Sequence, residues 1–467
     1  MLNKDKFLDF ISENELVGSD SSQLFSYSQP IEMHEFLSLK FKLLNDRDFL
    51  FYWGQPSEDF YFIAKGELYS ICTNEFRNLF QLDEQLNDLP FKTFSNRTNI
   101  SLTRDPLFVG GIKFPSGKRD ERWNDFDFAK WSIPNILLLK SANDYKVIIN
   151  VIRNHSNKNS FWNEVGELFS TIELSGNETP HNKEIPVKVL SNMPRVEIDE
   201  WSNQIQSALE KISHNKLQKV VLSRYNEIEL SGPLNIANQL DRLESNFGNC
   251  DTFAYKSKES FFFGTSPEKL FRVRDGLLET DALAGSIQRG IDDAEERILE
   301  ERILCDEKNL AEHKTVVDFL LFQLTPLTEK ILFDSQPSIK KYSNIQHLYS
   351  QIRAKLKSDV SFFSLLEKLY PTPAVCGFPS DQALSVINEL EDFDRGLYSG
   401  AIGWFNLSGS ADFSVGIRSA LLRGNILQAY AGCGIVKGSD PLSEYIETEL
   451  KQKPILNLFA DEAVCKS

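Results

Sequence analysis

Hydrophobic residues recur along this chain at two different spacings, which separate expected strands from expected helices. Apolar and polar positions alternate, or form short aromatic runs closed by turn residues, in residues 49–72, 106–152, 219–224 and 261–273. Such stretches are typical of strands in a partly or fully buried sheet. Much of the chain is therefore expected to be β-sheet.

Apolar residues spaced three and four apart predict helices over residues 1–45, 199–215 and 299–323, the last as one long helix. Residues 281–290 are rich in alanine, glycine and serine and predict a loop, and the polar residues 173–186 indicate a linker. No repeat of fixed period interrupts this mixture. We expect a large α+β protein in which antiparallel sheets pack against helices.

Composition limits the partners. The 467 residues are 41% hydrophobic and 12% aromatic, which is ample for a large core. The net charge of −16 argues against nucleic acid and against an anionic membrane surface. No apolar run reaches the length of a membrane span, and six scattered cysteines without a CxxC pair fit a reducing compartment. We expect a cytoplasmic protein without membrane segments.

The stretch of residues 429–451 carries the densest candidate chemistry. It reads A-Y-A-G-C-G-I-V-K-G-S-D-P-L-S-E-Y-I-E-T-E-L-K, a glycine-rich segment expected to be a loop, followed by a helix that begins at Ser439-Asp440-Pro441. Glu444, Glu447 and Lys451 share one face of that helix. They suit a metal ion beside an anionic substrate, or they form an ordinary solvated helix face with one ion pair.

Two further residues could move protons. Lys219 begins the apolar strand K-V-V-L-S-R, where an inward-facing lysine could act as a base; the alternative is a lysine at a strand end in solvent. Glu268 lies in the turn G-T-S-P-E between two apolar strands. It is either an acid that protonates a leaving hydroxyl or a residue that stabilises the turn.

Other polar residues lie within apolar surroundings. Glu312 stands at the edge of a helix face and could share one magnesium ion with Glu447, whereas His313 is expected at the helix surface or behind a ligand. His347 and Arg418 lie in apolar strands, and a buried arginine needs an anionic partner, which is either a carboxylate of the chain or one of a substrate.

Eight short motifs resemble, in order, those of the chorismate-utilising enzymes: isochorismate synthases, salicylate synthases, and the large subunits of anthranilate and aminodeoxychorismate synthases. Across residues 217–453 they are K-V-V-L-S-R, G-T-S-P-E, L-A-G-S, A-E-H-K, Q-H-L-Y-S, P-T-P-A-V-C-G, the strand with Arg418, and A-G-C-G-I-V…S-E-Y-I-E-T-E-L-K. The resemblance implies one large unit, with antiparallel sheets sandwiched between helical layers. Residues 1–195 would be its N-terminal half and residues 196–460 the chorismate-binding catalytic region.

The resemblance also implies roles for individual residues. Lys219 matches the base that activates water, Glu268 the acid that protonates the C4 hydroxyl, and Glu312 and Glu447 the Mg²⁺ ligands, with Glu444 behind them. Substrate-facing positions are matched by Ala284, Gly285, Ser286, His347, Arg418, Gly432, Cys433, Gly434 and Lys451. Asn309 departs from the pattern, because relatives often carry an acidic residue there.

The lysine and the L-A-G-S motif favour an isochorismate synthase, a magnesium-dependent isomerase that acts on chorismate. Salicylate synthase, which also eliminates pyruvate, is the nearest alternative, followed by an anthranilate or aminodeoxychorismate synthase large subunit. A non-catalytic member of the family is disfavoured by the intact lysine and carboxylates. The product would feed menaquinone or siderophore synthesis, and we expect a monomer.

Overall fold

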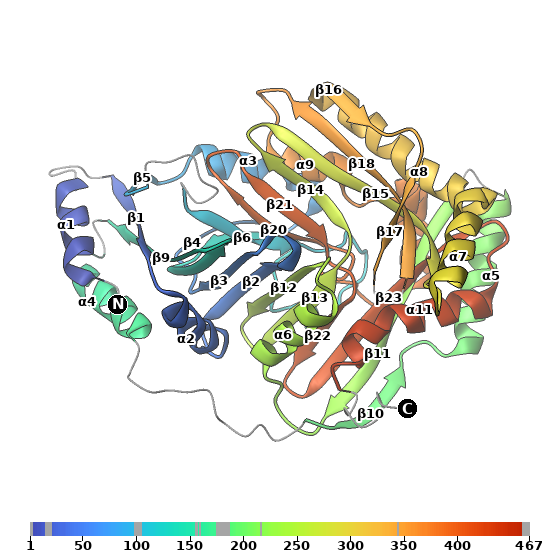
Figure 1. Ribbon diagram of the computed structural model, residues 1–467, viewed down its shortest axis with the longest axis horizontal. Helices are drawn as coiled ribbons and strands as arrows, with labels where there is room; N and C mark the ends of the chain where they lie inside the picture. Colours follow the sequence, from blue (N-terminus) through green and yellow to red (C-terminus); the bar gives the residue numbers. More distant parts are fainter. Residues whose placement is uncertain are drawn as a thin grey trace.

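The computed structural model describes residues 3–14, 21–97, 105–154, 157, 160–173, 187–214, 217–342 and 345–459. Two large sheets dominate the described part of the chain, and helices flank them (Figure 1). Neighbouring strands pair antiparallel, except for the parallel pair of β1 (Ser22–Pro30) with β5 (Phe91–Ser95). The prediction of an α+β fold built on antiparallel sheets is confirmed.

The first sheet has 13 strands within the described ranges. Their order is β10 (Val189–Pro194), β11 (Lys219–Leu230), β23 (Ile426–Val436), β22 (Ser419–Arg423), β13 (Ser260–Ser266), β12 (Asp251–Ser257), β2 (Phe49–Gln55), β3 (Phe60–Lys65), β8 (Ile136–Ser141), β9 (Asp144–Arg153), β1 and β5, with β19 (Gly377–Phe378) paired to β11.

The second sheet has 10 strands within the same ranges. Their order is β16 (Thr328–Phe333), β18 (Ile345–Leu356), β15 (Leu277–Gln288), β14 (Lys269–Arg274), β21 (Ala411–Val415), β20 (Ala401–Asn406), β6 (Leu107–Ile112), β7 (Ala129–Ile133) and β4 (Tyr69–Thr73), with β17 (Ser338–Lys341) paired to β18.

The described helices are α1 (Lys4–Asn14), α2 (Met33–Leu44), α3 (Phe80–Asn87), α4 (Phe161–Ile172), α5 (Ile198–His214), α6 (Ile236–Asn246), α7 (Asp293–Cys305), α8 (Glu307–Leu324), α9 (Phe362–Leu369), α10 (Ser380–Leu390) and α11 (Pro441–Leu456). Short 3₁₀ turns occur at Pro56–Glu58, Phe76–Asn78, Glu121–Trp123 and Thr325–Leu327. None of these helices combines the length and the apolar character that crossing a membrane requires.

Three large apolar clusters among the described residues hold the layers together. Aromatic residues such as Phe51 and Trp404 fill the space between the two sheets. Helices α1, α2, α4 and α6 cover the outer face of the first sheet, whereas α3, α8 and α9 pack on the second. Burying a large aromatic side chain contributes roughly 1.5–3 kcal/mol relative to leaving it exposed, so these clusters are the main stabilising term.

Two of the predicted helices are wrong. Residues 1–45 are not all helical, because β1 lies between α1 and α2; its serines and glutamines sit among apolar residues, and Gln23 and Ser26 are buried. The long helix predicted over residues 299–323 is two helices. Asp306 has an extended backbone and caps α8, since its carboxylate accepts a hydrogen bond from the amide of Asn309 at 2.8 Å. Residues 174–186 of the predicted linker lie outside the described residues.

Candidate active site

All the residues that the sequence singled out as site residues line one cavity of about 240 Å³. They come from β11, the β13–β14 turn, β15, α8, β18, the residue just before β22, β23 and α11. The described lining lies entirely between Lys219 and Lys451. Residues separated by more than 200 positions in the sequence are therefore gathered by the two sheets into one place.

Lys219 faces the cavity from the first position of β11. Its side chain is 5% exposed, and its ammonium lies 2.6 Å from Oε1 of Glu312 on α8. The alternative of a lysine at a strand end in solvent is wrong, because β23 pairs beside it and α8 lies across the cavity. A buried ammonium needs such an anionic partner.

Glycines in β23 make room for this lysine. A Cβ atom at Gly434 would stand 2.6 Å from Cε of Lys219, and one at Gly432 would stand 2.9 Å from the carbonyl oxygen of Leu222. The prediction that the glycine-rich segment is a loop is wrong, since Gly432 and Gly434 lie in β23, which extends to Val436. Its glycines serve close approach between strands β11 and β23.

Glu268 occupies the turn between β13 and β14 and is 7% exposed. Burial raises the pKa of its carboxyl to about 7, although a hydrogen bond from Thr372 and the charges of Lys219 and Lys451 oppose the shift. The hydroxyl of Thr372 donates to Oε1 of Glu268 at 3.3 Å. A carboxylic acid that keeps its proton near neutral pH can protonate a leaving group.

Helix α11 presents its charged face to the cavity. Asp440 caps the helix by accepting from the amide of Ser443 at 2.9 Å, and Pro441 occupies the first turn. Lys451 lies 2.6 Å from Oε1 of Glu447 and donates to the carbonyl of Gly432 at 3.0 Å. Glu444 is buried on the same face. The alternative prediction, an ordinary solvated helix face, is therefore wrong.

Neighbouring charges set the protonation of Glu447 and Glu444. Burial opposes ionisation at Glu447, but the ammonium of Lys451 holds the pKa of Glu447 below its ordinary value. Burial, with the charge of Glu447, raises the pKa of Glu444. Glu447 is thus held ionised beside a carboxyl that is easier to protonate, which suits one strong oxygen ligand with a weaker one behind it.

Arg418 lies between β21 and β22, with a left-handed backbone (φ 50°), not inside a strand as predicted. It is 9% exposed, and no carboxylate oxygen of the described residues lies within 4.0 Å of its guanidinium. Of the two partners predicted for this arginine, a close carboxylate of the described chain is ruled out. A buried guanidinium that lines a cavity without such a partner suits an anionic ligand.

His347 stands on β18, where its Nδ1 lies 2.7 Å from Oγ of Ser286. Burial, reinforced by the charges of Arg418 and Lys451, lowers the pKa of His347 to about 3, so its ring is neutral near pH 7. Its Nε2 is buried and has no hydrogen-bond partner among the described residues. This nitrogen is available to a bound molecule.

The Ala284-Gly285-Ser286 segment is not the predicted loop but part of β15, which pairs with β18. The pairing register shifts at Gly285, whose φ is +76°, so a β-bulge turns this segment toward the cavity. Asn309 packs against the bulge, since a Cβ at Gly285 would stand 3.1 Å from its Oδ1. Of the two places expected for His313, the helix surface is wrong, because His313 is buried and its Nε2 lies 3.0 Å from Oγ of Ser350.

Several lining residues were not found in the sequence. Tyr398 is buried with its hydroxyl near Gly432 and its ring stacked on Tyr430 at 5.0 Å, and Lys308 lies one helical turn before Glu312. The spacing of Lys308 from Glu312 was a usable signal. Tyr398 offered none, because it reaches the site through a long-range contact. Thr372, which does not line the cavity but contacts Glu268, lies in the P-T-P-A-V-C-G motif.

The donor set fits magnesium. Glu312 and Glu447 bring hard carboxylate oxygens to one cavity, and the described residues hold no group of three or more histidine, cysteine or acidic side chains arranged for a metal. Two carboxylates without a complete protein cage suit Mg²⁺, which keeps several waters and shares oxygens with an anionic substrate.

The fold and the cavity together define an α+β protein whose cavity is lined by buried cations and carboxylates. The chain belongs to the family described as chorismate binding enzyme, whose sequence model matches residues 11–460. The resemblance inferred from the eight motifs is confirmed. The protein is therefore an enzyme of the chorismate-binding class.

Individual relatives agree with this assignment. The isochorismate synthase MenF of Bacillus subtilis is 30% identical over 456 residues, covering 94% of this chain and 94% of that protein. The salicylate biosynthesis isochorismate synthase of Pseudomonas aeruginosa is 31% identical over 347 residues, covering 74% and 72%. The solved structure of MenF, the menaquinone-specific isochorismate synthase from Escherichia coli, has the same fold, with a TM-score of 0.79 at 24% identity over 97% of this chain and 99% of that one.

Proposed function

We propose that the protein is an isochorismate synthase, which converts chorismate to isochorismate with magnesium as its metal. The observation that carries the proposal is that a buried lysine, Lys219, and a buried acid with a pKa near 7, Glu268, line the same cavity. An exchange of hydroxyl position needs one group to take a proton and another to give one. The names of the two similar relatives from Bacillus and Pseudomonas support the same activity.

The cations of the cavity would bind the substrate. Arg418 and Lys451 are positioned to bind the carboxylates of chorismate, and the backbone of residues 432–434 lines the same wall. The neutral ring of His347 offers its unpartnered Nε2 to a substrate oxygen. In an acidic protein these few placed cations supply the local positive charge that a dianion requires.

The chemical step exchanges one water for another. Lys219, in its neutral amine form, takes a proton from a water molecule. The oxygen of that water bonds to C2 as the ring double bonds shift toward C4. Glu268 gives its proton to the C4 hydroxyl, which leaves as water. The ring thus gains one hydroxyl and loses one, so chorismate and isochorismate are isomers.

Glu312 and Glu447 would hold Mg²⁺, with Glu444 behind them. When bound, the metal supplies positive charge that offsets the negative charge of a substrate carboxylate.

We further propose that residues 196–460 form the catalytic region and residues 1–195 the supporting half, and that the protein is a cytoplasmic monomer. The product would enter menaquinone or siderophore synthesis.

Product analysis tests the activity. Purified protein is incubated with chorismate and Mg²⁺ without ammonia, and the products are separated by chromatography, with an EDTA-treated sample as the control. Isochorismate alone, absent from the control, is the expected result. Salicylate with pyruvate would make the protein a salicylate synthase, and a product that requires ammonia would make it an amino-transferring enzyme.

A further inference from the structure

A buried ion pair lies directly behind the cavity. Arg395 is fully buried and Glu391 is 3% exposed. Nε and Nη2 of Arg395 donate to the two carboxylate oxygens of Glu391 at 2.8 and 2.5 Å, and the guanidinium stacks on the ring of Phe114 with its carbon 4.4 Å from the ring centre. Such a bidentate pair fixes the plane of the guanidinium as well as its charge.

The pair holds strand β11 at two points. Nη2 of Arg395 donates to the carbonyl of Val221 at 2.7 Å. Oε1 of Glu391 accepts from both the amide and the hydroxyl of Ser223, at 2.8 and 3.0 Å. Because alternate residues of a strand share a face, Val221 and Ser223 point the same way as Lys219. The strand that carries the proposed base is thus fastened two and four residues from it.

The same guanidinium also holds the turn behind Glu268. Nη1 of Arg395 donates to the carbonyl of Val375 at 2.9 Å. The amide of Val375 donates to the carbonyl of Thr372 at 3.2 Å, and the hydroxyl of Thr372 donates to Glu268 at 3.3 Å. One side chain is therefore linked to the strand of the proposed base and to the turn that orients the proposed acid.

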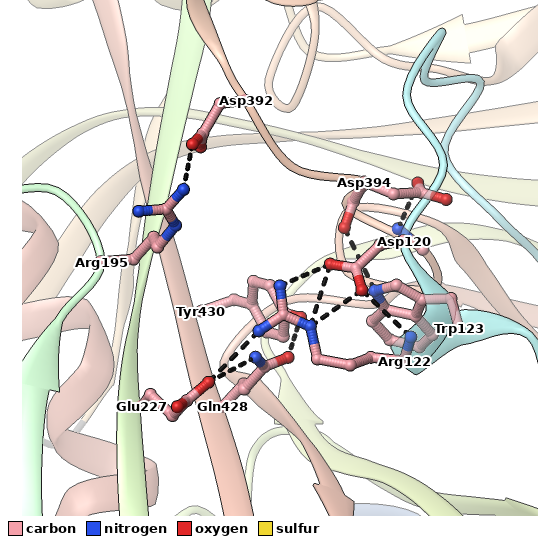
Figure 2. Close-up of polar contacts among 10 residues, drawn as sticks. Asp120, Arg122, Trp123, Arg195, Glu227, Asp392, Asp394, Gln428 and Tyr430 are labelled. Atoms are coloured by element: carbon pink, nitrogen blue, oxygen red, sulfur yellow. Dashed lines mark hydrogen bonds and ion pairs between the residues drawn. The ribbon is translucent and has the colours of Figure 1, made fainter.

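The loop that carries Arg395 is anchored on its other side (Figure 2). An ion pair joins Asp392 to Arg195, the indole of Trp123 donates to the carbonyl of Asp394 at 3.1 Å, and the carboxylate of Asp394 accepts from the amide of Gly396 at 2.9 Å. A Cβ at Gly396, where φ is +55°, would stand 2.0 Å from the ring of Trp123. The contacts of Asp394 and Gly396 with Trp123 leave the loop little room to move, whereas the ion pair of Asp392 is about half exposed and contributes little.

We propose that Arg395 is a positioning residue, which together with Glu391 sets the separation between Lys219 and Glu268. This inference rests on the proposed function, since it assigns meaning to the distance between the proposed base and acid. Arg395 is not among the described residues that line the cavity. Its effect passes through the backbone of β11 and through Thr372.

Arg395→Lys separates positioning from charge. A lysine can still pair with Glu391, but its single ammonium does not reproduce the fork that serves a carboxylate and two carbonyls. Displacing catalytic groups by about 1 Å costs on the order of 100-fold in rate. We expect kcat to fall about 10- to 100-fold while KM for chorismate stays within about threefold, because the binding cations are untouched.

Three further variants make the test sharp. Asp392→Asn breaks the exposed ion pair on the same loop and is expected to keep the wild-type kcat. Thr372→Val is expected to lower kcat by itself, and much less in the Arg395→Lys background, because residues that act through one contact are not additive. Thr372→Ser, which keeps the hydroxyl, is expected to restore most of the rate.

The inference fails if Arg395→Lys keeps its kcat, if kcat falls only as far as in Asp392→Asn, or if its effect and that of Thr372→Val simply multiply. Should the lysine variant not fold, the neutral pair Arg395→Met with Glu391→Gln is measured against the same criteria, since it leaves no buried charge unpaired. Wild-type protein that forms another product from chorismate would overturn the proposed activity alone; the variants would then be compared on that product.

Discussion

The ammonium of Lys219 lies 2.6 Å from Oε1 of Glu312, so the proposed base is ion-paired with a proposed metal ligand. The two residues come from β11 and α8 and meet only because both elements border the same cavity. Among the described residues, each side chain forms its ion pair within 4.0 Å with the other. A change at either residue is therefore expected to alter both proton transfer and metal binding.

Removing one carboxylate charge should weaken magnesium binding. We expect Glu312→Gln and Glu447→Gln each to lower the affinity for Mg²⁺ by more than about tenfold, measured by calorimetric titration in the presence of chorismate. Glu449→Gln, on the exposed side of α11 with a side chain 56% exposed, is the control. Equal affinity in all three variants would show that Mg²⁺ does not bind at this site.

Loss of either proton-transfer group should stop turnover without unfolding the protein. General acid or base catalysis contributes roughly 10²- to 10⁴-fold, so Lys219→Ala and Glu268→Gln should each reduce kcat by that order. Circular dichroism and thermal unfolding would show the fold intact. Near-normal turnover in either variant would exclude that residue from its proposed role.

The titration of Glu268 should make the stability of the protein depend on pH. Burial raises the pKa of its carboxyl from 4.5 to about 7, so the folded state holds a proton that the unfolded chain has lost across this range. The stabilisation that comes from this bound proton is therefore fully present below pH 4.5 and is lost as pH rises through 7. This loss lowers the free energy of unfolding by on the order of 3 kcal/mol.

Glutamine cannot ionise and is free of this loss. Relative to wild type, Glu268→Gln should gain stability progressively between pH 4.5 and 8, measured by urea unfolding without metal. The same comparison for Glu449→Gln should be flat. A flat difference for Glu268→Gln as well would show that its carboxyl titrates normally.

A methyl group at Gly434 should disturb the proposed base. Its Cβ would stand 2.6 Å from Cε of Lys219 and 3.5 Å from Oε1 of Glu312. Because the end of a lysine side chain can move aside, Gly434→Ala should fold almost normally while its kcat falls on the order of 100-fold. Gly232→Ala, where no atom lies within 4 Å of the new Cβ, is the control; equal rates in both would contradict this role of Lys219.

Local chemistry was visible in the sequence where neighbours along one element define it. The cap at Asp440 and the shared face of Glu444, Glu447 and Lys451 follow from helical spacing, and the structure contains both. Residues 281–288 were mistaken for a loop, because small residues that admit the neighbouring helix α8 look the same as turn residues.

Long-range contacts were not visible. The pairing of Arg395 with Val221 spans 174 positions, and that of Thr372 with Glu268 spans 104. No periodicity encodes such contacts, which depend on how the two sheets are assembled. The motifs located the residues of the site, whereas the groups that orient them required the structure.

The most direct measurement is the reaction of chorismate and Mg²⁺ in ¹⁸O-enriched water without ammonia, with the product identified by chromatography and mass spectrometry. We predict isochorismate as the sole product, with one ¹⁸O atom at C2 in the wild-type protein, and formation of this product at least about 100-fold more slowly by Lys219→Ala. Unlabelled isochorismate would contradict attack by water, and salicylate with pyruvate, or no product, would contradict the proposed activity.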